Sequence, residues 1–199
     1  MYRTFFALAL SATASIGAHA QSAASETQRD ANQQERIEQG LQSGQLSTRE
    51  AGQLERDQQH IDRTQARDMR DGSLSPQEKA RIQHEQNLAN RDIYRDKHNA
   101  ATGNPNSASL QRLQADVQRN ANQQQRIANG VKTGQLTNPE AAHLEAGQKR
   151  ESRNEANAAA DGHVGPREQT HIQSRENHQS ERIYDKKHNE KTRPGANGG

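Results

Sequence analysis

The sequence predicts an all-α protein built as a tandem duplication of antiparallel helical hairpins, elongated, with a flexible linker and tail. Three observations lead to this prediction. The chain of 199 residues matches itself when it is shifted by 90 positions. Turn signals that contain Gly recur within each copy, and the segments between them are rich in Gln, Glu, Arg, Lys and Ala, which favour helix. Hydrophobic residues make up only 28% of the chain, too few for the large core of a compact globule.

Residues 1–20 have the pattern of a secretory signal peptide. Arg3 provides the positive start, an apolar stretch begins at Phe5, and small residues lead to an A-x-A cleavage site that ends at Ala20. We expect cleavage after Ala20 and a mature protein that is periplasmic or secreted. The apolar stretch is shorter than the roughly 18 residues that a membrane-spanning helix needs, so no membrane span is predicted. Residues 21–29 are expected to form an N-terminal linker.

The duplication divides the rest of the chain into two helical repeats, at 30–99 and 109–189. The run Ala31–Gln34 recurs as Ala121–Gln124, and the same spacing relates many further positions. Agreement of this extent without a gap indicates a tandem repeat. The segment 100–108 is rich in Gly, Asn, Pro and Ser and is expected to be a linker. The last residues, numbered 190–199, are expected to form a disordered tail.

Each repeat contains two loops with the pattern x-G-x-[LV]-[STG]-x-x-E. The Gly suits the left-handed backbone just past a helix end, and the Ser, Thr or Gly that follows serves as N-cap of the next helix. The Glu completes a capping box, and the Leu or Val before the cap provides a hydrophobic staple. Pro76 and Pro166 fit the first helical position. The pattern therefore predicts helix–turn–helix at 43–50, 71–78, 133–140 and 161–168.

The segments between these loops are expected to be helices, among them 48–70 and 76–98, each about 33 Å long. In the second repeat the spacing of Leu110 and Val117 extends the first helix backwards, with Ser109 as its expected N-cap. Large apolar residues are few, so we expect marginal stability and hairpins completed by a partner or by the second repeat. The first repeat has only eleven large apolar residues: Ile37, Leu41, Leu46, Leu54, Ile61, Met69, Leu74, Ile82, Leu88, Ile93 and Tyr94.

The pattern shared by the four loops resembles the second half of the calcium-binding loop of EF-hands, a helix–loop–helix family. In that loop Gly stands at position six, an aliphatic residue at eight and Glu at twelve, as do Gly72, Leu74 and Glu78 here. The resemblance implies that the loops bind a divalent cation. A plain helical turn is the alternative, because Arg67 and Met69 replace oxygen ligands at positions one and three. The ligands that the resemblance implies are Asp71, Glu78, Asp161 and Glu168.

The stretches Leu46–Glu50, Leu74–Glu78 and Leu136–Glu140 are also similar to the LTxxQ motif of Spy/CpxP-type periplasmic stress proteins, with Glu in place of Gln. Those proteins are small, exported and helical. The similarity implies a role in binding clients or partners.

Two Tyr–His pairs stand at equivalent positions near the end of each repeat. Each His follows its Tyr by four residues, so both rings lie on one side of a helix. The alternative is that these residues only complete a helix end. The pairs, Tyr94 with His98 and Tyr184 with His188, are the candidate partner contacts.

Other function classes find no support in the sequence. The net charge is only +2, and charges of both signs alternate, whereas a nucleic-acid-binding protein needs a surface of one sign. Cysteine is absent, which excludes disulfides and thiol chemistry. Nucleophile, phosphate-binding and metalloprotease motifs are also missing, so no enzyme is predicted.

The sequence therefore predicts an exported, non-enzymatic helical repeat protein that acts as a periplasmic binding or scaffold module, or in a stress response. It is expected to bind a protein partner or itself, to bind no nucleic acid and to use no cofactor. The alternative function is low-affinity binding of calcium or another divalent cation by the EF-hand-like loops.

Overall fold

The structure, a computed structural model, describes the backbone of residues 15–191 and the side chains of residues 23–191. Most of the predicted signal peptide and of the predicted tail lie outside these residues. Over the described range the chain forms helices and no strand, which confirms the all-α fold. The helices are α1 (Ser15–Ser43), α2 (Thr48–Asp68), α3 (Pro76–Lys97), α4 (Ala108–Thr133), α5 (Asn138–Ala158) and α6 (Pro166–Lys187).

The duplication is visible in the helix boundaries. The first and last residues of α5 and α6 follow those of α2 and α3 by 90 positions, and α4 corresponds in the same way to the later part of α1. Each repeat therefore folds into the same three helices, joined by turns at the predicted places.

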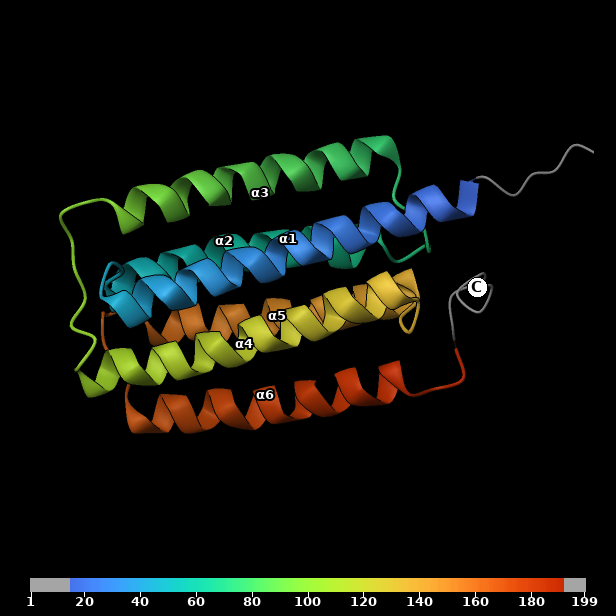
Figure 1. The fold of residues 1–199 in the computed structure, drawn as a ribbon. Coiled ribbons are helices and arrows are strands. Elements are labelled where there is room, and N and C mark those ends of the chain that lie inside the picture. Colours follow the sequence, from blue (N-terminus) through green and yellow to red (C-terminus); the bar gives the residue numbers. More distant parts are fainter. Residues whose placement is uncertain (1–14, 192–199) are drawn as a thin grey trace, which may run out of the picture.

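The central helices pack mainly on their counterparts in the other repeat. The most extensive contacts are between α1 and α4 and between α2 and α5, and the helices of each pair run antiparallel (Figure 1). Helix α3 packs on α1 and α2, and α6 packs on α4 and α5. The two repeats are thus related by an approximate two-fold axis and build one bundle, so each repeat completes the hairpin of the other.

Small residues allow the close approach of α2 and α5. A Cβ atom on Gly52 would lie 2.7 Å from the Cβ of Ala159, and Ala156 on the same helix pair is buried. Because any side chain at position 52 would push the two helices apart, Gly is required there despite its low helix propensity.

The apolar residues form two clusters at opposite ends of the bundle, with polar residues between them. Along α4, Leu113 belongs to one cluster and Ile127 to the other, while Asn120, Gln123 and Gln124 between them are buried. Along α1 the buried Asp30, Gln33 and Gln34 likewise separate Ala23 from Ile37. We refer to the buried polar side chains between the two clusters as the polar middle.

The predicted turn chemistry is confirmed. Gly44, Gly72, Gly134 and Gly162 have φ of 74°, 94°, 77° and 88°, the left-handed region that only Gly adopts freely. Capping boxes join Ser47 to Glu50, Ser75 to Glu78 and Thr137 to Glu140. At Gly165 only the Glu half of the box can form, because Gly has no side chain: Gly165 N–H donates to Glu168 Oε2 at 2.8 Å.

The segment 21–29 is helical, where the sequence predicts a linker. It belongs to α1, and α3 and α4 hold it in place. Gln83 Nε2 donates to Glu26 Oε1 at 2.8 Å, and Gln28 Nε2 donates to Gln125 Oε1 at 3.1 Å. These contacts come from residues remote in sequence, so local patterns could not reveal them.

One smaller expectation needs correction. The N-cap of α4 is Ser107, whose side chain accepts from Leu110 N–H, while Ser109 is buried and its Oγ accepts from Val164 N–H at 2.7 Å. Of the eleven large apolar residues of the first repeat, nine are buried, whereas Leu88 and Tyr94 are exposed, at 38% and 62%, because these two positions face away from α1 and α2.

None of the helices in the described range is both long and apolar enough to cross a membrane.

Candidate functional site

The carboxylates of the EF-hand-like loops serve as local caps. Asp71 Oδ1 accepts from Ser73 N–H at 2.9 Å, and Glu78 Oε2 accepts from Ser75 N–H at 2.8 Å. In the second repeat, Asp161 Oδ1 accepts from His163 N–H at 2.8 Å, and Glu168 makes the contact with Gly165 described above. The two loops lie at opposite ends of the bundle (Figure 1), so the structure does not bring their carboxylates together.

Each Tyr–His pair forms a stacked pair of rings on the surface. The ring centroids of Tyr94 and His98 are 4.1 Å apart, and those of Tyr184 and His188 are 4.0 Å apart. Both Tyr residues are exposed, at 62% and 58%. The imidazole Nδ1 of each His lies 2.6 or 2.7 Å from the carbonyl oxygen of its Tyr. This distance indicates an Nδ1–H that donates to the end of the helix.

The two stacks are far apart, because α3 and α6 end at opposite ends of the bundle (Figure 1). The molecule thus presents the same aromatic feature twice, once at each end.

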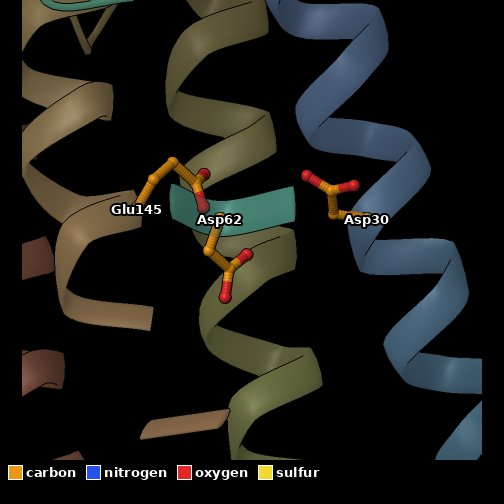
Figure 2. A group of neighbouring side chains, drawn as sticks. All are labelled: Asp30, Asp62 and Glu145. Carbon is orange, nitrogen blue, oxygen red and sulfur yellow. The ribbon is translucent and has the colours of Figure 1, made fainter. Parts of the chain in front are cut away.

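The polar middle contains a cluster of three buried carboxylates. Asp30 comes from α1, Asp62 from α2 and Glu145 from α5 (Figure 2). Their side chains are at most 1% exposed, and one oxygen of each lies within 4.8 Å of the others. Across the described residues, no other group of three or more His, Asp or Glu side chains meets this spacing. We call these three residues the acidic cluster.

Three Gln side chains surround the acidic cluster and donate to it. Gln65 and Gln86 donate to the two carboxylate oxygens of Asp30, and the Gln86 bond measures 2.6 Å. Gln124 Nε2 donates to Asp62 Oδ1 at 3.2 Å and to Glu145 Oε2 at 3.1 Å. Within the part of the chain that is described, no Lys, Arg or His pairs with any carboxylate of the cluster.

Burial without a basic partner disfavours the ionised form of these carboxyl groups. Burial, followed by the nearby charge of Glu145, raises the pKa of Asp30 and Asp62 well above their ordinary values. Burial also raises the pKa of Glu145 to about 7. At neutral pH the cluster therefore needs either bound protons or a positive ion to offset its charge.

The positions related by the duplication differ in charge. Asn120 stands where the first repeat has Asp30, Ser152 where it has Asp62, and Glu55 corresponds to Glu145. This second half of the polar middle contains further buried carboxylates, among them Glu155 and Glu176.

Glu176 differs from the acidic cluster in having a basic neighbour. Arg119 Nε lies 3.2 Å from Glu176 Oε2. Even so, burial raises the pKa of Glu176 to about 8. Burial also raises the pKa of Glu55 to about 7 and that of Glu155 well above its ordinary value.

Sequence reasoning did not find the acidic cluster, although one signal for it exists. Gln58 lies in the helically spaced series of Ala51, Leu54 and Ile61, so a polar residue already stands on the buried face. Asp62 and Gln65 follow Gln58 at the spacing of the same face. Polar residues on an otherwise apolar stripe were the available sign of a buried polar layer.

In comparisons with known proteins, no protein-family model matches the chain, and no curated protein and no solved structure is significantly similar to it.

Proposed function

We propose that this protein is an exported, non-enzymatic binding module with two equivalent contact sites, one at each end of the helical bundle. Each site is a stacked Tyr–His pair, Tyr94 with His98 and Tyr184 with His188. Exposed aromatic side chains are favoured at protein interfaces, because they offer a large contact area at low cost in conformational entropy. A module with two such ends can join two copies of one partner, or associate with itself.

The retention of both stacks carries the proposal. Buried positions have diverged between the repeats: Asp62 and Ala89 of the first correspond to Ser152 and Gln179 of the second. The exposed Tyr and His residues remain identical, with nearly the same ring geometry. Packing alone gives little reason to keep an aromatic ring that is more than half exposed, whereas recognition of the same partner at both ends does.

The rest of the surface favours a specific partner over unfolded clients. Among the side chains described, the only large hydrophobic residues that are exposed are Leu88, Tyr94 and Tyr184. A chaperone for unfolded chains needs a broader apolar surface. A scaffold role is therefore more consistent with this molecule than general client binding.

Site-specific photocrosslinking tests this proposal. A photoreactive residue is placed at position 94 or 184 of the full-length chain in its native host, with exposed Ala80 and Thr170 on the same helices as matched controls. The expected result is one crosslinked product common to 94 and 184 and absent at 80 and 170. No product at 94 and 184, or different partners at the two ends, would contradict two equivalent sites.

Low-affinity binding of a divalent cation by the loops at 71–78 and 161–168 is a second proposal. Asp71 and Asp161 are exposed at the loop surface, where an ion can reach them. A calcium titration followed by amide NMR should then shift signals centred on Gly72 and Gly162. If these signals stay in place up to millimolar calcium, the loops are plain turns.

A further inference from the structure

We propose that the acidic cluster of Asp30, Asp62 and Glu145 binds one hard, oxygen-preferring divalent cation of the size of calcium inside the bundle. This site is separate from the loops and from the Tyr–His stacks, and it does not depend on either proposal about them.

The spacing of the carboxylates suits such an ion. Oxygens that coordinate Ca²⁺ at about 2.4 Å can be at most about 4.8 Å from one another, and the three carboxylates each offer an oxygen within 4.8 Å of the others. Two of the carboxylates come from α1 and α2 of the first repeat, and the third comes from α5 of the second. An ion held here would therefore connect the two halves of the bundle.

Unpaired oxygens around the cluster provide independent support for a ligand. Within the described part of the chain, Glu145 Oε1 has no hydrogen-bond partner, although Glu145 is fully buried. Gln86 keeps its Nε2 toward the cluster, because this group also donates to the carbonyl oxygen of Glu26 at 2.9 Å. The amides of Gln65 and Gln124 lack such a contact: among the described residues their oxygens are buried and unpartnered, while their Nε2 groups point at the cluster. Rotation of each of these two amides by half a turn exchanges oxygen and nitrogen and directs an amide oxygen at the cluster.

Together the three carboxylates and the two rotatable amides form a suitable ligand set. Three carboxylates, each with two oxygens, and two amides offer up to eight oxygens, and Ca²⁺ takes six to eight, from carboxylates bound through one or both oxygens and from amide carbonyls. Soft transition metals prefer sulfur or imidazole ligands, which this set lacks. Mg²⁺ usually keeps several of its waters, and fully buried ligands leave little room for them. The chemistry thus favours a calcium-like ion.

The charge of the cluster points to the same ligand. Among the described side chains, no basic residue pairs with the three carboxylates, whereas Glu176 in the other half of the polar middle has Arg119 beside it. A bound divalent cation would offset the repulsion that otherwise only protons can relieve. Because all three side chains are at most 1% exposed, we expect the ion to enter during folding or through slow opening of the helices.

The duplication supplies the matched variant. The double substitution Asp30→Asn/Asp62→Ser gives the first half the residues that stand at 120 and 152 in the second. It removes two ligands and two buried charges, so it should fold without a metal. Asp71→Asn/Asp161→Asn is the control for the loops.

The experiment uses the full chain without its signal peptide. The protein is unfolded in urea with EDTA, refolded with Ca²⁺, Mg²⁺ or no metal, and desalted, and bound metal is measured by elemental analysis. Eu³⁺ is then used as a calcium probe, because its luminescence lifetimes in H₂O and D₂O report the number of waters on the ion. A buried site should leave few or no waters on the ion, whereas an exposed loop site should leave several.

We expect one tightly held calcium per chain, few waters on Eu³⁺ and a higher melting temperature with calcium than with EDTA at pH 7.5. The Asp30→Asn/Asp62→Ser variant should lose all three responses, and the loop variant should keep them. The proposal is overturned if the wild type retains no metal, if the core variant still responds, or if binding depends on the loop residues and leaves several waters on Eu³⁺.

Discussion

Removing divalent cations and raising the pH should destabilise this bundle, the reverse of the usual behaviour of carboxylate-rich proteins. The clearest contributions come from Glu55 and Glu176, which are fully buried and lie outside the acidic cluster. Burial raises the pKa of Glu55 to about 7 and of Glu176 to about 8, from an ordinary value of 4.5. Between pH 4.5 and these raised pKa values, the folded chain binds more protons than the unfolded chain. The free energy of unfolding therefore falls as the pH rises through this range.

The size of the effect follows from the pKa values. A shift of one unit corresponds to about 1.4 kcal/mol. The shift of Glu55 from 4.5 to about 7 therefore gives about 3 kcal/mol, and that of Glu176 from 4.5 to about 8 gives about 5 kcal/mol. This stability is fully present below pH 4.5, the ordinary value, and is lost as the pH rises past 7 to 8. Because domains are stable by only about 5–15 kcal/mol, the metal-free chain should be close to unfolding at pH 8.

Urea unfolding in EDTA, followed by circular dichroism at several pH values between 5 and 8, measures this effect. The variant Glu176→Gln carries the residue that stands at the equivalent position 86, so it should fold and show a clearly smaller loss of stability with pH. Glu181→Gln, at a side chain that is 72% exposed, should leave the curve unchanged. A free energy of unfolding that is constant or rises from pH 5 to pH 8 would refute the reasoning.

Three further predictions concern the backbone and the helix contacts. Substituting Val for both Gly72 and Gly162, whose φ values are positive, should lower the melting temperature by about 5–10 °C; an unchanged melt would contradict the assigned turns. Gly147→Ala would place a Cβ 2.1 Å from Gln179 Oε1 and should cost about 1–3 kcal/mol in urea unfolding. Adding Gln179→Ala should recover part of that loss, and purely additive effects in the double-mutant cycle would exclude the contact. Gly165→Ser adds the side-chain cap that α6 lacks and should stabilise the chain by about 0.3 kcal/mol, seen as a small rise in melting temperature.

The local structure of this chain could be predicted from its sequence because local interactions decide it. The left-handed Gly44 and Gly72, the capping boxes such as Ser75 with Glu78, and Pro76 at a first helical position all act within one or two helical turns. Their energies are large enough to begin and end a helix at a given residue. The 90-residue period likewise showed that the three-helix unit occurs twice.

Only the tertiary structure decided which helices pack together. The sequence pattern describes hairpins of neighbouring helices, yet α1 packs most extensively on α4, and α2 on α5. Contacts of this kind depend on matching surfaces, such as Gly52 against Ala159, that are far apart in the chain. Contacts between distant parts of the chain, here of α1 with α3 and α4, also hold segment 21–29 in a helix.

The acidic cluster is the strongest example of this limit. Each of its residues, Asp30, Asp62 and Glu145, stands in a polar helical segment, where the local sequence suggests a side chain exposed to solvent. Folding brings them together at the centre, because the two repeats lie antiparallel with their apolar ends apart and their polar middles in contact (Figure 1). Local sequence thus determined where each helix begins and ends, whereas the pairing of the repeats decided which charges are buried, since desolvation depends on what covers a residue from elsewhere in the chain.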